Sequence, residues 1–540
     1  MGHEGNAVGA RLRNQKVASI DCDCFCSRWE RVLLFDNGEI AAYLLLSLGG
    51  GGNKELVRKR PVRPVDGEVF CFYSRGGLAH VISISIRILV RSEMATPDAN
   101  STIKVSAASM VRLISIFTAV VSMTSYGQDL ADSATVARTI KQLKLTGISM
   151  RSSAVDNDFT DLVLLKRTLE PVQLILLGEQ SHGEGSVFST KVRLIKFLHE
   201  NMGFDILAFE SSFFACAKAQ DQISAGENAS DVAPMSIYPL WSQTAEVRPL
   251  FEYIEVSRKT NRPLILAGFD SRMVPFAGSP SLTRELEKYL HRKNSSAVRE
   301  SSWSSTSTTI DSLLKREREY NMTQAHWDSL ARGLDIIRRD LQSSSSTDMD
   351  SRFWLKVLDN VSATSEFLRI PLANWKRLNS VRDRQLADNL LWLLNVRYPG
   401  KKIIAWTASY HAARRLPEIH FSGMAPYDSV LTMGDTLYSA LGSRLYSVAF
   451  TGYSGSYSDW AGQPKSVDSA ATGSLEDIMN RTGFERAFFD LRGQPKDTDL
   501  ARSEFFARPM GYSWRPAIWP HHFDAIVFDK RIAPSTRVSK

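Results

Sequence analysis

A glutamate and a histidine stand three residues apart in the run Leu177-Gly-Glu-Gln-Ser-His-Gly-Glu184. A histidine titrates near neutral pH. A neighbouring carboxylate holds one tautomer of the ring and stabilises the imidazolium once the ring has taken a proton from water. We therefore assign His182 as a candidate general base and Glu179 as the carboxylate beside it. An ion pair or a helix cap is the competing explanation, but the glycine-flanked turn after an apolar run favours a site.

Further acidic and basic side chains follow other apolar runs. These runs end at or just before Glu210, Asp270 and the segment Ala408-Ser-Tyr-His411. Ligands of open α/β sheets bind outside the carboxyl ends of the parallel strands, so we expect these groups to meet at one edge. Glu210 is expected to orient the base or the water. His411 would polarise the substrate or complete a proton relay, and Lys191 would offer positive charge to a developing oxyanion.

Several other hydrolase designs are missing from the sequence. No Gly-x-Ser-x-Gly elbow stands at a strand-to-helix turn in the catalytic region, and neither His-Glu-x-x-His nor a phosphate-binding Gly-x-x-x-x-Gly-Lys-[Ser/Thr] occurs. We predict no cofactor and assign no metal ligand. The set Glu179, His182, Glu210 and His411 is nevertheless chemically suited to zinc or manganese, so a metal-dependent hydrolase on the same residues stays open.

From about residue 130, the elements that position these residues are alternating strands and helices. Short β-rich apolar runs are separated by helical stretches, which predicts parallel strands joined by crossover helices. A helix over 189–202 follows the first run and is expected to stop at Gly203. The predicted strands are Val172–Leu177, Phe204–Phe209, Pro263–Gly268, Lys402–Thr407, Leu445–Phe450 and Phe523–Phe528.

The middle of the chain, about 280–395, has no β-rich run. It contains four charged amphipathic stretches, joined by serine-rich links at 295–308 and 342–350 whose composition suits loops. The predicted helices are Leu282–Arg292, Thr309–Leu341, Ser351–Ile370 and Val381–Val396. The predicted fold class is therefore α/β, with a mostly parallel central sheet flanked by helices and an inserted all-helical subdomain.

The composition is that of an ordinary globular protein. Hydrophobic residues make up 43% and charged residues 23% of the 540 residues. The formal net charge is +8, but the basic excess is thin and spread along the chain, which argues against a nucleic-acid partner. A single cysteine, Cys216, follows residue 127, so no intramolecular disulfide is expected there.

Residues 110–127 resemble a secretory signal peptide. A short basic start precedes an apolar run from Leu113 to Met123, which is too short to span a membrane, and small residues follow it. Because such signals work at an N-terminus, we expect translation to start at Met94 or Met110, which makes 1–109 an over-extended N-terminal extension. A buried helix in a real N-terminal domain is the alternative. If 110–127 is a true signal peptide, we expect the protein to be exported to the periplasm or the extracellular space. Otherwise we expect a cytoplasmic location.

Several segments in order resemble the erythromycin esterase family over about 150–530, within a domain at 130–535. The first two are Gly178-Glu-Gln-Ser-His-Gly183 with Lys191, and Leu207-Ala-Phe-Glu210. Later ones are Gly268-Phe-Asp270, Arg382-Asp383, Ala387-Asp-Asn389, Trp406–His411, Met433-Gly434 and Phe523–Phe528. The resemblance implies Glu179, His182 and Glu210 as active-site residues. It also implies a histidine base activating water against a macrolide lactone, without an obligatory metal. We add Arg382 to the candidate substrate-binding residues.

Two positions depart from the family pattern. The family's Trp-Ala-His-Asn-x-His motif reads Trp406-Thr-Ala-Ser-Tyr-His411, so Ala408 replaces the first histidine. The acidic residue after the first motif is displaced, with Glu184 next to Gly183. Both changes leave the base and its carboxylates in place but weaken the case for macrolides. The family also includes members linked to succinoglycan biosynthesis.

Three hypotheses follow for function. The first is a hydrolase that cleaves an ester or lactone of a small molecule with His182-activated water. The second is the metal-dependent hydrolase on the same residues. The third is a carbohydrate- or ligand-binding module that lost the reaction, in which Trp241 and Trp406 would stack on the ligand, although a core role suits both tryptophans better.

Overall fold

The computed structural model describes residues 65–75, 78–88, 131–151, 156–272, 281–314, 322–343, 348–421 and 424–538. The chain divides into two compact units, Cys26–Tyr126 and the remainder. In the smaller unit the described residues form an antiparallel hairpin of β1 (Val65–Arg75) and β2 (Leu78–Ile88). The segment 110–127 and the rest of 1–109 lie outside the described residues, so the predictions of a signal peptide and of an over-extended start stay predictions.

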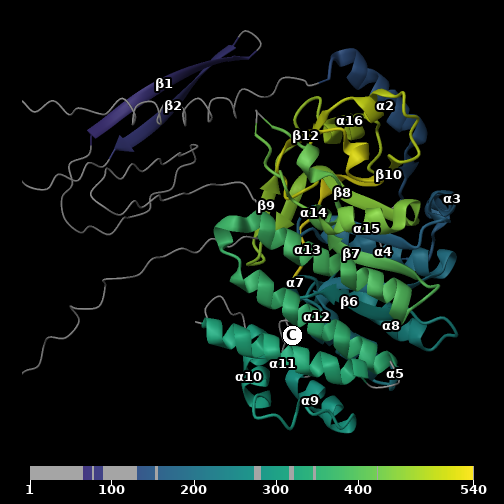
Figure 1. The fold of residues 1–540 in the computed structure, drawn as a ribbon. Helices are drawn as coiled ribbons and strands as arrows, with labels where there is room; N and C mark the ends of the chain where they lie inside the picture. The colour runs from purple at the N-terminus through teal and green to yellow at the C-terminus, as the bar shows by residue number, and fades with distance from the viewer. Residues whose placement is uncertain are drawn as a thin grey trace, which may run out of the picture. The chain divides into compact units, whose positions relative to one another are not determined.

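The larger unit is built on a nine-stranded, mostly parallel sheet (Figure 1). Its strand order is β3-β10-β13-β8-β4-β7-β5-β6, with β9 paired to β8. The strands are β3 (Ile148–Ser149), β4 (Leu174–Glu179), β5 (Phe204–Ser212), β6 (Ile265–Asp270), β7 (Lys402–Ala408), β8 (Leu445–Ser458), β9 (Pro464–Val467), β10 (Arg486–Asp490) and β13 (Ala525–Ile532). Pairs from β13 through β8, β4, β7 and β5 to β6 are parallel, whereas β3, β9 and β10 pair antiparallel. The predicted α/β class is confirmed.

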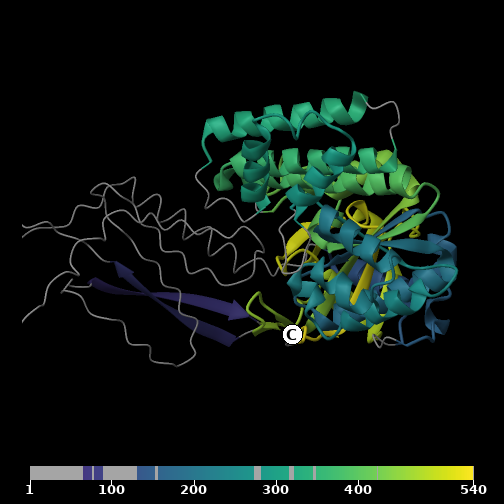
Figure 2. The same ribbon diagram turned by 90° about the horizontal axis from the view of Figure 1, so that it is seen from below.

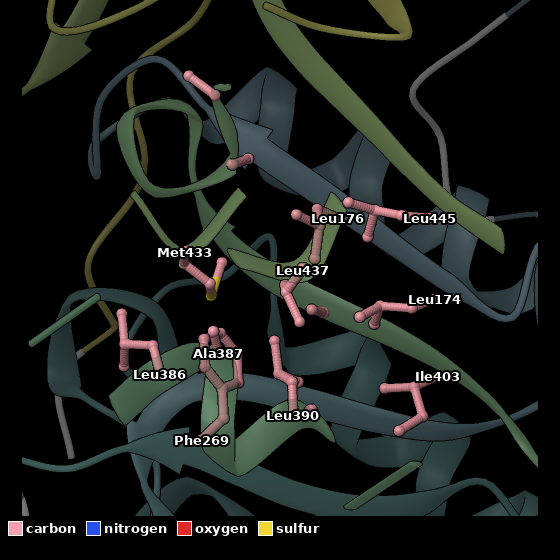
Figure 3. Close-up of a cluster of buried hydrophobic side chains, with 14 of the residues drawn as sticks. Leu174, Leu176, Phe269, Leu386, Ala387, Leu390, Ile403, Met433, Leu437 and Leu445 are labelled. Atoms are coloured by element: carbon pink, nitrogen blue, oxygen red, sulfur yellow. The ribbon is translucent and has the colours of Figure 1, made fainter. Parts of the chain in front are cut away.

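Alternate residues of the central strands enter two different cores. On β4, Leu174 and Leu176 belong to one buried cluster, and Ile175 and Leu177 belong to the other. This alternation is the period of two that a strand imposes, and both faces are apolar because helices cover both. Figure 3 shows Leu174 and Leu176 facing Leu390 of α13 (Trp375–Trp392) and Leu437 of α15 (Met433–Leu441).

Helices on the other face contact the second cluster. After β4, α4 (Gly185–Met202) ends at Gly203, whose φ of 75° is the left-handed conformation that glycine adopts without strain. The remaining elements outside the helical subdomain are α2 (Ser133–Thr146), α3 (Leu165–Leu169), α5 (Phe213–Ser224), α6 (Ala229–Val232), α7 (Pro239–Ser242), α8 (Arg248–Arg258), α14 (Ser409–Ala412), α16 (Leu475–Arg481), α17 (Asp499–Arg502), and the pair β11 (Phe505–Ala507) and β12 (Arg515–Ala517).

The predicted helical subdomain lies between β6 and β7 and forms a layer on one side of the α/β body (Figure 2). Besides α13 it contains α9 (Leu282–Arg292), α10 (Trp303–Leu314), α11 (Gln324–Ser343) and α12 (Met349–Arg369), and α13 continues into the π-helical turn η5 (Leu393–Arg397). No strand occurs among its described residues. None of the helices in the described part of the chain is long and apolar enough to cross a membrane.

Two local predictions were wrong in this subdomain. The serine-rich link at 295–308 was expected to be a loop, but α10 begins inside it at Trp303. The single helix predicted over 309–341 is two helices, α10 and α11. Thr306 of α10 packs where a Cβ on Gly333 of α11 would lie, with its Oγ1 2.2 Å from that position. Tertiary packing of this kind stabilises a serine- and threonine-rich helix that local propensity disfavours.

Replacement of Leu390 by alanine should lower the free energy of unfolding by about 2–5 kcal/mol, because it leaves a cavity between α13 and the sheet. Leu390 is fully buried. The measurement is urea unfolding followed by circular dichroism. The control is the same change at Leu145, which is 77% exposed and should cost little. Equal losses in the two variants would contradict the packing described for α13.

Candidate active site

The predicted base and its carboxylate are in contact. His182 Nδ1 lies 3.0 Å from Oε1 of Glu179, the last residue of β4. The same oxygen accepts a hydrogen bond of 2.9 Å from the indole N–H of Trp241. Because Glu179 accepts, the contact favours the tautomer with the proton on Nδ1, which leaves the lone pair on Nε2. The His182 side chain is 19% exposed, whereas Glu179 is fully buried.

Lys191 lies on the buried side of Glu179. Its ammonium hydrogen-bonds Oε2 of Glu179, and it donates to the carbonyl of Thr407 at 3.2 Å. The ammonium also lies 4.6 Å from the ring centroid of Trp406. Lys191 therefore pairs with Glu179. It does not face the solvent side, although the oxyanion role predicted for Lys191 requires its ammonium to lie there.

Arg382 joins two carboxylates, Glu210 near the end of β5 and Asp270 at the end of β6. From α13 it donates 2.8 Å hydrogen bonds to Oε1 of Glu210 and Oδ2 of Asp270. Burial alone would raise the pKa of Glu210, but the positive charges of His411 and Arg382 outweigh it and hold that pKa well below its usual range. Glu210 is therefore a carboxylate near neutral pH.

A second histidine–carboxylate pair stands beside this cluster. His411 Nδ1 lies 2.5 Å from Oδ1 of Asp383, and its Nε2 lies 3.1 Å from Arg382 Nη1 and 3.4 Å from Glu210. Burial would lower the pKa of His411, but Asp383 and Glu210 raise it above the usual value. Asp383 is fixed in turn, because it accepts the backbone N–H of Met433 at 3.0 Å.

Strand β7 connects the two histidine pairs. It lies between β4 and β5, and its last residue, Ala408, is in register with Glu179. Thr407 donates to Oε2 of Glu210 at 2.6 Å, and the backbone N–H of Ala408 donates to the same oxygen at 3.1 Å. The backbone of Ala408 is thus next to both glutamates, at the position where the family pattern has a histidine. All the predicted acidic and basic site residues lie at the edge of the sheet where β4, β5, β6 and β7 end. We call this edge the site edge.

Trp241 and Trp406 are buried, with 1% and 0% exposure. Trp241 acts on the site through its hydrogen bond to Glu179, and Trp406 lies against Lys191. Neither indole face is open to a ligand, so the stacking role considered for them in a binding module has no surface here.

Two residues at the site edge were not among the predicted site residues. Asp383 orients His411, and its signal was present in the sequence, directly after Arg382. Trp460, in the turn between β8 and β9, lies with its ring centroid 5.5 Å from that of His182. Its turn is more than 270 residues along the chain from His182, so no local pattern could indicate the contact.

Glu184 is a further buried carboxyl group, next to the His182 turn. It accepts the backbone N–H of Ser181 at 3.2 Å and the hydroxyl of Tyr512. Burial raises its pKa to about 8, although these hydrogen bonds act in the opposite direction. Gly183 is required beside it, because a Cβ there would lie 1.7 Å from the carbonyl oxygen of Ser458. These contacts fix the turn that carries His182.

The carboxylates of the site edge already have protein cations as partners. Lys191 pairs with Glu179, and Arg382 pairs with Glu210 and Asp270. Within the described ranges, no group of three or more His, Cys, Asp or Glu side chains is arranged to hold a metal ion. The donor set that suggested zinc or manganese is thus divided between two cation-paired clusters.

Comparisons with known proteins bear on this fold and site. The family model for erythromycin esterase matches residues 199–532, which include Glu210 and His411 and follow Glu179 and His182. The Bacillus subtilis (strain 168) protein named Putative hydrolase YbfO is 27% identical over 360 residues, covering 59% of this chain and 74% of that protein.

Solved structures have the same fold. A protein from Bacillus cereus aligns with a TM-score of 0.63 and 17% identity, covering 75% of this chain and 99% of its own. A succinoglycan biosynthesis protein aligns with a TM-score of 0.61 and 16% identity, covering 75% of this chain and 99% of its own. A mutant of the erythromycin esterase EreC in its open conformation aligns with a TM-score of 0.58 and 18% identity. The alignment covers 73% of this chain and 100% of that protein.

The family match and the relative define the class of this protein as a hydrolase. The chain belongs to the erythromycin esterase family, which confirms the resemblance found in its motifs.

The raised pKa of Glu184 predicts a pH-dependent stability. The folded state binds the Glu184 proton more tightly than the unfolded state, so this stabilisation is full below about pH 4.5 and is lost as pH rises to about 8. Glu184→Gln removes the titration. The free energy of unfolding of the wild type should therefore fall relative to this variant between those two pH values.

The measurement is urea unfolding at a series of pH values. Glu252→Gln, which removes a carboxylate whose side chain is 58% exposed, is the control for charge alone. A constant difference between wild type and Glu184→Gln across the series would contradict the protonated, buried state of Glu184.

Proposed function

We propose that this protein hydrolyses a carboxylic ester or lactone of a small molecule, with His182 as the general base that activates water. The observation that carries the proposal is the Glu179–His182 contact of 3.0 Å, in which the carboxylate is buried and the imidazole is partly exposed. Family membership supports the same class of reaction. A lone surface histidine would have no buried carboxylate to stabilise its protonated form.

In the proposed reaction, Nε2 of His182 removes a proton from water as the oxygen attacks the carbonyl carbon. The imidazolium then forms against Glu179, whose negative charge stabilises it. When the tetrahedral intermediate collapses, the C–O bond to the leaving group breaks, and the imidazolium returns the proton to the leaving alkoxide. The products are the carboxylic acid and the alcohol, or the opened hydroxy acid of a lactone.

His411 is proposed to act on the carbonyl oxygen. Asp383 and Glu210 raise its pKa, which favours the protonated ring, and in this form the ring would stabilise the negative charge of the intermediate. Arg382 has a positioning role, because its guanidinium donates to Glu210 and Asp270 and so fixes the carboxylate that lies beside the His411 ring.

The substrate within this class remains part of the proposal. A macrolide lactone is the substrate that the family's name implies, but Ala408 stands where the family pattern has a histidine. An imidazole is therefore missing at this position, and we propose an ester or lactone whose cleavage does not need a second histidine there.

His182→Asn should lower kcat/KM for 4-nitrophenyl acetate about 10²–10⁴-fold, because the variant keeps a similar shape but cannot accept the proton. Glu179→Gln should reduce the rate less. Turnover is measured by release of 4-nitrophenolate, and a panel of macrolides is assayed in parallel by mass spectrometry.

The control is His326→Asn, at an exposed histidine of the helical subdomain. Full activity in His182→Asn would contradict the role of this residue. Loss of wild-type activity with chelator, and its return with zinc or manganese, would instead support the metal-dependent mechanism.

We further propose that the protein is exported, on the signal-like pattern of 110–127. The mature N-terminus should then lie just beyond Gly127, as read by N-terminal sequencing of the protein from its native host. A mature chain that retains residues 1–90 would contradict both the export and the start at Met94 or Met110.

A further inference from the structure

Trp460 is the largest of the exposed apolar side chains in the described part of the chain. It is 51% exposed, although burial of an indole is favourable. Its ring lies 5.5 Å from His182, the same centroid distance as that of Trp241. The imidazole is therefore flanked by two indoles, of which Trp241 is buried beneath the site and Trp460 is open to solvent.

The turn that carries Trp460 is held in place by its own backbone and by neighbours. Oδ1 of Asp459 accepts the backbone N–H groups of Ala461 and Gln463 at 3.0 and 2.8 Å. Lys465 pairs with Asp459 at 3.1 Å, and Arg537 donates to the carbonyl of Trp460 at 2.6 Å.

The strand before this turn is tied to the His182 turn. The backbone N–H of Ser458 donates to the carbonyl of Gly183 at 2.8 Å, and Ser535 donates to the same carbonyl at 2.8 Å. Trp460 and His182 are thus fixed relative to each other by backbone hydrogen bonds. A ligand that packs on this indole does not have to order the turn first, and this lowers the entropic cost of binding.

We propose that Trp460 is a specificity-determining residue whose exposed indole packs against an apolar ring of the ester substrate next to His182. This inference rests on the proposed function and extends it, because it identifies the substrate class as esters with a broad apolar ring. Aromatic side chains suit such a platform because they offer a large contact area with few rotatable bonds.

The test compares two esters with the same leaving group, 4-nitrophenyl acetate and 4-nitrophenyl 2-naphthoate. Trp460→Ala should lower kcat/KM for the naphthoate about tenfold, which corresponds to about 1.4 kcal/mol, and leave the acetate nearly unchanged. Trp460→Phe, which keeps an aromatic face, should retain most of the naphthoate activity. Tyr438→Ala, at a tyrosine of α15 that is 47% exposed, should change neither ester.

A purely structural role for Trp460 gives a different result. If the indole only shields His182, then Trp460→Ala should slow both esters equally and move the pH profile of kcat/KM for the acetate, and this would overturn the proposal. Trp460→Phe keeps the comparison possible if the alanine variant does not fold.

Failure of the proposed function can be recognised separately. The binding of 2-naphthoate to wild type, Trp460→Ala and Tyr438→Ala is measured by isothermal titration calorimetry, which needs no turnover. Wild type that hydrolyses neither ester but binds 2-naphthoate through Trp460 would contradict the esterase reaction and support the platform. If wild type hydrolyses both esters and all three proteins bind 2-naphthoate equally, the role of Trp460 as a platform is contradicted, but the proposed esterase reaction is not.

Discussion

Buried carboxylates at the ends of β4, β5 and β6 impose the constraint on which the rest of the site depends. An uncompensated charge in a protein interior is very costly, so each carboxylate must have a cation and hydrogen-bond donors in place. Lys191 meets this need for Glu179, and Arg382 meets it for Glu210 and Asp270. The helices α4 and α13 that carry these cations are therefore bound to the sheet edge by charge as well as by apolar packing.

This arrangement produces two histidine–carboxylate pairs with different environments. His182 lies at the solvent side with Glu179 behind it, and His411 lies deeper between Asp383, Glu210 and Arg382. The two pairs are linked through the end of β7, because Ala408 is in register with Glu179 and its backbone N–H bonds Glu210.

The same edge explains how the site could change substrate without losing its base. Ala408 lies next to Glu179 and Trp460 next to His182, and neither takes part in the cation–carboxylate pairs. Substitution at such positions changes the shape and polarity of the pocket, while Lys191 and Arg382 continue to fix the carboxylates. Family membership therefore defines the class of chemistry more firmly than the substrate.

The sequence by itself determined the six mutually parallel strands of the sheet and most of the acids and bases of the site, whereas the antiparallel strands β3, β9 and β10 were not predicted. Buried strands are apolar runs, and the polar residues at their ends stand out locally: Glu179 and Asp270 were indicated in this way, although both strands end two residues later than predicted. The helical subdomain was also visible, because its amphipathic pattern extends over many turns.

Only the tertiary structure decided which groups meet. The partner of Lys191 is 12 residues away, but those of Arg382 are 112 and 172 residues away. The sequence suggested an oxyanion role for Lys191, and the fold turned its ammonium towards Glu179. Trp460 reaches His182 only because β8 is long enough to extend beyond the end of its neighbour β4 to Gly183. Contacts between distant segments depend on strand order and length in space, and neither has a local signature in the chain.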